Sequence, residues 1–286
     1  MSIAELLELH KPETVFSDQA WGNDPGGSGP TPVIFTPSFR NGSGTAMKAQ
    51  SKPRRPGGAV AVLGSGGKTT LLWQLARHFR QERVLVSTTV KMWSPEPGQY
   101  DFFPEATSFA GEAKARPGIT FAGTVLPDLG KVGALPPEAL GKRLSHFDKI
   151  FIEADGSRGL PYKGWAEHEP VVPEWIDLTL AVMPIPRPEW VVTESFIHRL
   201  PLFCAISGAR PGEPLRLEHL AAAIAHPAGL LAKARGRIVL FFNQAESGKA
   251  RKLARHIASL LPEHCRDRLW KIVAGSARQN VGTVIY

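Results

Sequence analysis

The sequence predicts an α/β protein with a mostly parallel sheet and flanking helices, similar to P-loop NTPases. Short apolar runs alternate with segments of helical spacing along residues 59–286, as in sheets covered by helices on both faces. The run at residues 59–63 ends in glycines, as a buried parallel strand does. Gly67-Lys68-Thr69 then stands between this strand and the next helical segment. These three observations predict one nucleotide-binding domain over residues 59–286.

The remaining elements follow from hydrophobic spacing. A short N-terminal helix is expected within residues 1–16, and longer helices at residues 70–80 and 248–261. Further strands are expected at residues 84–88, 148–153, 178–182, 238–242 and 269–273, with an edge strand at 281–285. The Pro- and Gly-rich stretch at about residues 95–142 predicts irregular structure around the strand ends, where such sheets bind ligands.

Residues 17–58 differ in character from the rest of the chain. They are rich in Gly, Pro and Ser, and such a segment buries too little apolar surface to offset the entropy lost on ordering. We therefore expect a mostly disordered insertion near the N-terminus. The basic cluster at residues 52–55 is expected to be a solvated part of it.

Composition narrows the class of protein. Of 286 residues, 43% are hydrophobic, which is enough for a sizeable core. No uninterrupted apolar run reaches the roughly 18 residues of a membrane span, and the N-terminus lacks the features of a secretory signal, so a cytoplasmic protein without a membrane partner is expected. Two distant cysteines argue against a disulfide framework or a structural zinc site. The net charge of +8 comes from scattered residues, which is typical of a generally basic surface; of the two alternatives, an anionic ligand is favoured over nucleic acid.

The glycine-rich stretch before the first long helix predicts a phosphate-binding loop. Gly67-Lys68-Thr69 matches the end of G-x-x-x-x-G-K-[ST], although Val62 stands at the first glycine position. Glycines let backbone N–H groups converge on an anion, and a helix start adds partial positive charge. Lys68 is expected to reach the β- and γ-phosphates, and Thr69 to hold Mg²⁺. The predicted loop residues are Gly64, Ser65, Gly66, Gly67, Lys68, Thr69 and Thr70.

Two carboxylates end the strand at residues 148–153. Glu153 and Asp155 are two residues apart, so they share a face on an extended chain. We expect Asp155 to join Thr69 in the Mg²⁺ shell and Glu153 to orient an attacking water. The alternative is a pair of strand-end carboxylates that cap the next loop or pair with Arg158.

Two loops near the C-terminus predict a pocket for the base. Asn243-Gln244-Ala245-Glu246 resembles the guanine-reading N-K-x-D element of GTPases, with Gln for Lys and Glu for Asp. Ser276 and Ala277 follow the last core strand, where GTPases place a loop against the base. Together these loops favour guanine over adenine, and both GTP and ATP remain open as ligands.

The order and spacing of several blocks resemble the YqeC family, named as accessory proteins of selenium-dependent hydroxylases. The blocks are residues 64–70, 87–93, 153–163, 168–173, 198–199, 226–231 and 242–244. The resemblance implies a role in maturing selenium-dependent molybdenum hydroxylases, with such a hydroxylase or a selenium-delivery protein as partner. Residues 17–58 depart from the family pattern, and so does Val90, where the family usually has threonine.

Other residues in these blocks are candidates for ligand contacts. Thr88 and Thr89 supply hydroxyls after the second strand, and Lys91 offsets phosphate charge unless it is a solvated lysine. A second substrate would lie near Arg158, Lys163, His168 and Glu169. For His168 the alternative is a structural histidine in a rigid loop.

Three functions are compatible with these motifs. The first is a Mg²⁺-dependent nucleoside triphosphatase that acts as a maturation factor, with Lys68, Glu153 and Asp155 as catalytic residues. The second is a small-molecule kinase or a nucleotidyl or phosphoryl transferase, which needs the same loop and metal. The third is a scaffold that senses nucleotide without turnover and binds its partner through residues 95–142.

Overall fold

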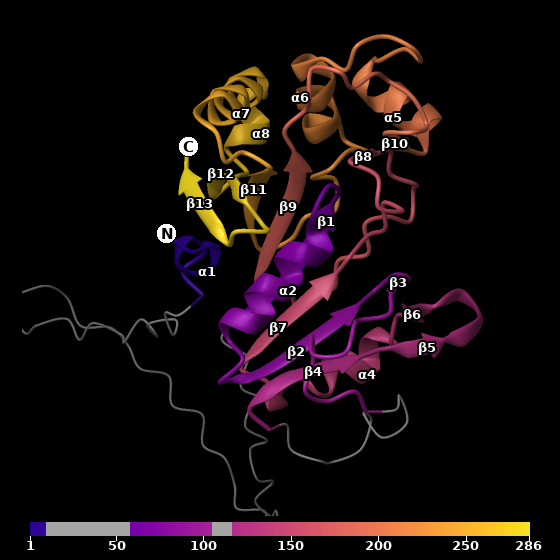
Figure 1. Ribbon diagram of the computed structural model, residues 1–286, viewed down its shortest axis with the longest axis vertical. Coiled ribbons are helices and arrows are strands. Elements are labelled where there is room, and N and C mark those ends of the chain that lie inside the picture. Colours follow the sequence, from indigo (N-terminus) through magenta and orange to yellow (C-terminus); the bar gives the residue numbers. More distant parts are fainter. Residues whose placement is uncertain (10–57, 105–115) are drawn as a thin grey trace, which may run out of the picture.

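The protein is built around one eight-stranded sheet (Figure 1). The computed structural model describes residues 1–9, 58–104 and 116–286, so the expected insertion at residues 17–58 lies outside the described residues, apart from Gly58. The strand order is β13-β12-β11-β9-β1-β7-β2-β4. The strands are β1 (Ala59–Gly64), β2 (Arg83–Thr88), β4 (Gly118–Ala122), β7 (Lys149–Glu153), β9 (Leu178–Pro184), β11 (Arg237–Asn243), β12 (Lys271–Ser276) and β13 (Val281–Val284).

The sheet is parallel except at one edge, where β13 pairs antiparallel with β12. β1 lies between β7 and β9, with Val62 opposite Glu153 on one side and Leu180 on the other. The carboxyl ends of β1, β7, β9 and β11 therefore meet at the same edge of the sheet. The predicted α/β class with a mostly parallel sheet is confirmed.

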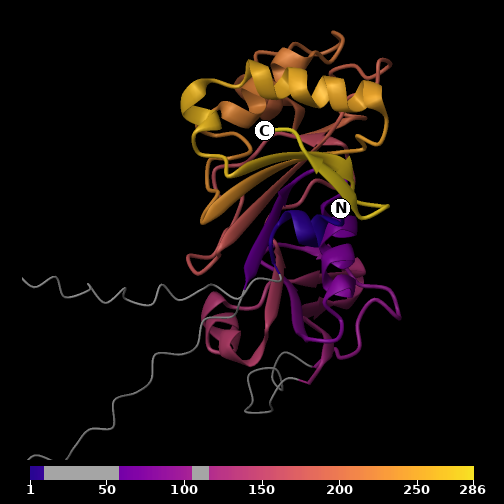
Figure 2. The same ribbon diagram turned by 90° about the vertical axis from the view of Figure 1, so that its left-hand side faces the viewer.

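Helices cover both faces of the sheet (Figure 2). Along β1, Ala59, Ala61 and Leu63 belong to one hydrophobic cluster, and Val60 and Val62 belong to the other, because successive side chains of a strand point to opposite faces. The second cluster contains α1 (Ile3–Leu6) and α2 (Lys68–His78); the first contains α5 (Leu200–Ser207), α6 (Leu217–Ala225) and α7 (Gly248–Leu260). Among the described residues, every helix is too short or too polar to span a bilayer.

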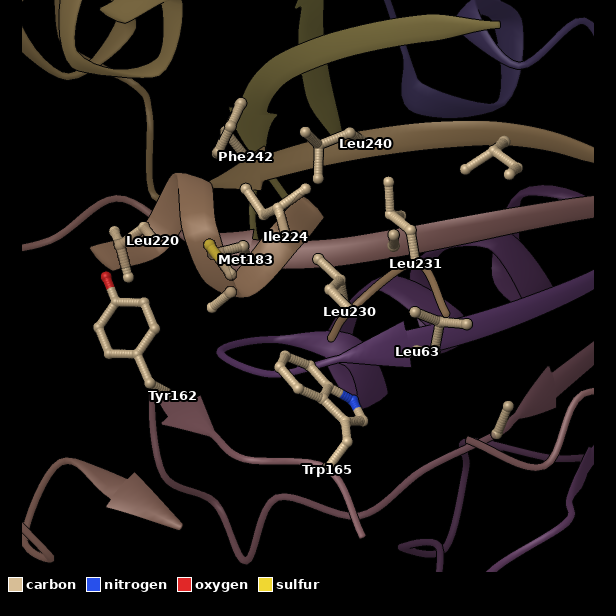
Figure 3. Packing of buried hydrophobic residues seen from close by; sticks show 14 of the residues in the cluster. Leu63, Tyr162, Trp165, Met183, Leu220, Ile224, Leu230, Leu231, Leu240 and Phe242 are labelled. Carbon is tan, nitrogen blue, oxygen red and sulfur yellow. The ribbon is translucent and has the colours of Figure 1, made fainter. Parts of the chain in front are cut away.

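The first cluster continues beyond the sheet into the loop that follows β7. Figure 3 shows Trp165 beside Leu230 and Leu63, and Tyr162 near Leu220 and Met183. The Tyr162 hydroxyl donates to the Pro184 carbonyl at 2.9 Å, which satisfies its buried polar group. This packing fixes the loop after β7 against the ends of β1 and β9.

The N-terminal helix packs on the domain, next to β13 (Figure 1). Ser2 caps it through its hydroxyl and Glu5. Lys271 Nζ donates to the Leu6 carbonyl at 2.8 Å, and Lys149 Nζ donates to the Leu9 carbonyl. Residues 1–9 are therefore part of the same core as the sheet.

The segment at about residues 95–142 is more regular than its Pro and Gly content predicts. It supplies the edge strand β4, which pairs with β2 through Val84 and Ile119. It also supplies β5 and β6, which form a small antiparallel sheet with β3. The other described elements are β3 (Met92–Trp93), β5 (Thr124–Leu126), η1 (Pro127–Leu129), β6 (Lys131–Gly133), α4 (Pro137–Gly141), η2 (Leu144–His146), β8 (Tyr162–Lys163), β10 (Ile197–His198) and α8 (Glu263–Arg266).

Candidate functional site

The glycine-rich loop between β1 and α2 is closely packed against its neighbours. Gly64, Gly66 and Gly67 have φ of 99°, 70° and 125°, a region that residues with a side chain rarely adopt. A Cβ on Gly66 would lie 2.4 Å from Pro184 Cγ, and one on Gly67 would lie 2.2 Å from Asn243 Nδ2. These two positions therefore require glycine.

The loop ends at the start of α2, where Gly67 is the N-cap and has no side chain to cap the helix. The first N–H groups of a helix have no acceptor within it, and the helix dipole makes this end positive. Lys68, the first residue of α2, is almost buried, and its Nζ donates to the Gly64 carbonyl at 2.8 Å. The loop and its lysine thus form the arrangement that an anion-binding helix start needs.

The two strand-end carboxylates occupy different surroundings. Glu153, the last residue of β7, accepts a hydrogen bond from the Thr69 hydroxyl at 2.8 Å and lines a cavity. Burial raises the pKa of Glu153, although Lys68 and the Thr69 hydroxyl oppose that shift. A cation placed beside this carboxylate would favour its charged form.

Asp155 is fully buried and lines neither of the two cavities beside the glycine-rich loop. Both of its oxygens accept from the Gly64 N–H at 3.0 Å, and Trp165 Nε1 donates to Oδ2 at 2.9 Å. Lys68 Nζ lies 3.4 Å from Oδ1, and Lys163 Nζ lies 3.2 Å from Oδ2. These contacts stabilise the conformation of the glycine-rich loop through Asp155. They favour Glu153, which accepts from Thr69, over Asp155 as the second protein ligand of a metal ion.

The buried charges continue outward from Asp155. Lys163, also fully buried, donates to Glu169 Oε2 at 2.8 Å and to the Gly156 carbonyl at 2.6 Å. Arg199 donates to both Glu169 oxygens. Burial alone would raise the pKa of Glu169, but the hydrogen bonds from Arg199 and Lys163 lower it to about 2. The charges of Asp155 and Glu169 are therefore matched by lysine and arginine inside the protein.

A first cavity of about 940 Å³ opens on one side of the glycine-rich loop. Gly66 and Gly67 form its inner wall, and the loops after β11 and β12 form another wall. Asn243 joins these loops, because its Nδ2 donates to the Gly66 carbonyl at 2.7 Å and its Oδ1 accepts from the Ala277 N–H at 2.8 Å. The Asn243 amide is thus used in positioning, whereas Gln244 and Glu246 are exposed on the cavity wall.

A second cavity of about 610 Å³ opens on the other side of the loop. It shares Gly66, Gly67, Thr70 and Gly159 with the first cavity. Its wall carries many charged side chains, namely Lys68, Lys91, Lys131, Glu153, Arg158, Glu169 and Arg199, together with His168 and His198. A ligand that bridges the two cavities would pass directly over the start of α2.

The structure brings most of the predicted residues to these cavities. The first is lined by Gly66, Gly67, Thr70, Asn243, Gln244, Glu246, Ser276 and Ala277; the second by Gly66, Gly67, Lys68, Thr69, Thr70, Thr89, Lys91, Glu153, Arg158, His168 and Glu169.

Five predicted residues line neither cavity: Gly64, Ser65, Thr88, Asp155 and Lys163. The Thr88 hydroxyl is buried and donates to the Val90 carbonyl at 3.0 Å. The Ser65 N–H donates to the Val182 carbonyl at 3.0 Å. The Lys163 ammonium is enclosed by Asp155, Glu169 and Trp165, which favours a role as counter-ion over the predicted contact with a substrate.

Several residues at the site were missed by sequence reasoning. Trp165 supports Asp155, and Trp93 and Lys131 line the second cavity from the small sheet. Arg187 and Lys249 line the first cavity. Trp165 lies two residues after Lys163, and Trp93 ends the block at residues 87–93, so both positions could have drawn attention. Lys131, Arg187 and Lys249 stand in segments with no motif.

Comparisons with known proteins agree on one family. The family model described as YqeC protein matches residues 60–201. A relative described as an uncharacterized protein YqeC, from Escherichia coli (strain K12), is 34% identical over 188 residues. That alignment covers 64% of this chain and 72% of the relative. The family-model match at residues 60–201 includes the glycine-rich loop, both strand-end carboxylates and the Lys163–Glu169 pair.

Proposed function

The chain belongs to the YqeC family, and from that premise and the geometry of its glycine-rich loop we propose that it binds and hydrolyses a magnesium-bound nucleoside triphosphate. One observation carries the proposal. Lys68 and Thr69 begin α2 where the two cavities meet, and the Thr69 hydroxyl is bonded to the Glu153 carboxylate. We propose that this hydrolysis serves the maturation of a selenium-dependent molybdenum hydroxylase, the role that the family resemblance in the sequence implies.

The phosphates would lie over Gly66, Gly67 and the first turn of α2. Backbone N–H groups and the helix dipole there stabilise negative charge. The Lys68 ammonium already lies under the loop, on the Gly64 carbonyl, and a short rotation of its side chain would bring it to the phosphates. Lys68 then supplies a positive charge without leaving the enclosed part of the site, where such charge acts most strongly.

The residues present fit a magnesium ion. The described residues contain no group of three or more His, Cys, Asp or Glu side chains that could hold a metal alone. Mg²⁺ needs no such cage, because it commonly binds one or two protein oxygens together with substrate phosphates and water. Thr69 and Glu153 offer such a pair of oxygens on the wall of the second cavity. When bound, Mg²⁺ would neutralise charge that develops on the phosphate oxygens.

Hydrolysis would occur at the end of the triphosphate that enters the second cavity. A water attacks the γ-phosphorus, the bond from that phosphorus to the β–γ bridging oxygen breaks, and a nucleoside diphosphate and inorganic phosphate leave. Such a reaction depends chiefly on positioning and charge stabilisation. Thr89 lines this end, and its hydroxyl donates to the Val171 carbonyl at 2.7 Å, so it is suited to report whether the γ-phosphate is present.

The base would occupy the first cavity, against the loops after β11 and β12. Glu246 is exposed on this wall, and a carboxylate there can accept from the N1 and N2 donors of guanine, which adenine lacks. This favours GTP over ATP. Asn243 fixes the distance between the glycine-rich loop and Ala277, so it would set the width of the base cleft.

A second candidate function is phosphoryl transfer to a small molecule. The observation that favours it is the extent of the second cavity, which continues past Lys68 and Thr69 to Trp93 and Arg199. Hydrolysis needs room only for a water at this end. Measuring product with and without added acceptors separates the two reactions.

The test is nucleotide binding and phosphate release by the purified chain. The wild type should bind GTP or ATP with Mg²⁺ and release phosphate, whereas Lys68→Ala and Thr69→Ala should each reduce turnover at least about tenfold. Lys142→Ala, an exposed lysine outside both cavities, is the matched control. Wild-type affinity and turnover in a folded Lys68→Ala protein would refute the proposal. Tight binding without turnover would instead support a nucleotide-sensing scaffold.

A further inference from the structure

We propose that the outer part of the second cavity binds a second ligand, a small molecule with at least two negative charges of the phosphate-ester or carboxylate class. This inference rests on the proposed function, because it places the ligand beside the terminal phosphate of the nucleotide. The outer part comprises the wall formed by Lys91, Trp93, Lys131, Arg158 and His198.

The cations of this wall form no ion pair with a carboxylate of the residues that the structure describes. The ion pairs next to the cavity are Lys68–Asp155, Lys163–Asp155, Lys163–Glu169 and Arg199–Glu169. None of the ion pairs among the described residues includes Lys91, Lys131 or Arg158. Three positive side chains therefore face one cavity with their charge unmatched, which attracts an anion.

The carboxylates of the same cavity do not cancel this charge. Glu169 is held by Lys163 and Arg199, so its negative charge is already matched. Glu153 accepts from Thr69 and is the proposed magnesium partner. A ligand in the outer part would therefore meet the positive charges of Lys91, Lys131 and Arg158.

The positions of the cations separate them from the phosphate loop. Lys131 begins β6 and lies directly opposite Trp93 of β3, with its Nζ 4.7 Å from the centre of the indole ring. Both belong to the small sheet, which Figure 1 shows beyond the tips of β2 and β7. Lys91 immediately precedes β3. Lys91 and Lys131 thus approach the cavity from the side away from the glycine-rich loop, where a second ligand rather than the triphosphate would meet them.

Arg158 and His198 complete the wall from the loop after β7 and from β10. Arg158 has φ of 52° and is exposed between the two cavities, beside Gly159, which lines both. Burial is the main reason that the pKa of His198 is lowered to about 4, and the positive charges of Arg199 and Arg158 act in the same direction. His198 is therefore a neutral hydrogen-bond partner near pH 7 in a cavity whose other outer polar groups are cationic. The 65% exposed Trp93 offers an apolar face for the body of the ligand.

The experiment titrates two probes into the wild-type chain by calorimetry, once alone and once saturated with Mg²⁺ and a non-hydrolysable GTP or ATP analogue. The probes are phenyl phosphate and phthalate, a phosphate ester and a dicarboxylate. At least one probe should bind in a saturable way to the chain that is saturated with Mg²⁺ and the nucleotide analogue. The ratio of the two dissociation constants tells which class of ligand is preferred. Replacing both lysines, Lys91→Ala with Lys131→Ala, should weaken that binding at least about tenfold. Lys142→Ala should leave it unchanged.

The outcomes separate this inference from the proposed function. It is overturned if neither probe binds, if the double variant binds the probe like the wild type, or if the probe displaces the nucleotide analogue, because the lysines then belong to the triphosphate site. If the analogue fails to bind the wild type but a probe binds through Lys91 and Lys131, the proposed function fails and the anion site stands. Lys131→Ala alone, which leaves Lys91 in place, should keep wild-type affinity for the nucleotide analogue.

Discussion

Replacing each strand-end carboxylate by its amide should separate a structural role from a metal-binding role. Asp155 is fully buried between the ammonium groups of Lys68 at 3.4 Å and Lys163 at 3.2 Å. Asp155→Asn removes the charge that these lysines share and turns an amide N–H₂ toward one of them. Breaking a buried ion pair by removing one partner costs about 3–5 kcal/mol. We therefore expect Asp155→Asn to lower the free energy of unfolding by about 3 kcal/mol.

Glu153→Gln should behave differently, because an amide oxygen can still accept from the Thr69 hydroxyl. Burial raises the pKa of Glu153, so the charged carboxylate is costly in the protein without a bound metal. Losing this charge in Glu153→Gln should therefore change the free energy of unfolding by less than about 1 kcal/mol. Magnesium-dependent phosphate release should fall at least about tenfold, equivalent to about 1.4 kcal/mol of transition-state stabilisation.

Two measurements on the same samples decide between the roles. Urea unfolding followed by circular dichroism gives the free energy of unfolding, and a Mg²⁺ titration of phosphate release gives the metal dependence. The reasoning is refuted if Asp155→Asn unfolds like the wild type but loses its metal dependence while Glu153→Gln keeps it. That result would return Asp155 to the metal shell.

Two further predictions concern the ends of the site. Glu246→Ala should erase a preference for GTP over ATP in a competition binding assay. Glu263→Ala, an exposed glutamate on α8, is the control. If Glu246→Ala still prefers GTP, another residue reads the base. The pKa of Glu169 is about 2 against an ordinary 4.5, so its contribution to stability is complete above pH 4.5 and is lost as the pH falls toward 2. Glu169→Gln should flatten that part of the curve of unfolding free energy against pH, and an unchanged curve would contradict the ion pairs with Lys163 and Arg199.

The main sheet could be predicted from sequence because most of its strands have an apolar central run. All residues of β1, β7 and β9 are buried, and their runs stand between turn residues. β4 escaped prediction because it follows a Pro- and Gly-rich stretch and carries Thr120 between Ile119 and Phe121, a pattern too short to separate from a loop. Two-residue strands such as β3 and β8 have no periodicity at all, since they depend on partners far along the chain.

The candidate site was predictable only where local sequence carries the chemistry. The glycines and Lys68 act through backbone geometry within one short segment, and the motif predicts that segment. The different surroundings of Glu153 and Asp155 depend instead on Trp165 and Lys163, which the loop after β7 folds back onto Asp155. Two carboxylates on one face of a strand look equivalent until that loop is placed. Lys131 reaches the second cavity only through its pairing with Trp93, and no spacing in the sequence encodes that contact.

Asp155 is shared between Lys68 and Lys163, so we expect the buried Lys163 to influence nucleotide binding without touching the proposed nucleotide. Lys68 must give up Asp155 and the Gly64 carbonyl to reach phosphates, and Lys163 lowers the cost because it still matches the Asp155 charge. Lys163→Met leaves Asp155 with Lys68 as its remaining ammonium partner, so Lys68 should be held back and nucleotide affinity should fall about tenfold. Adding Asp155→Asn removes the competing charge and should restore most of that affinity, a coupling that a double-mutant cycle measures. A purely structural Lys163 would lower the free energy of unfolding in Lys163→Met but leave the affinity of the folded protein unchanged, and that result would refute the shared-charge argument.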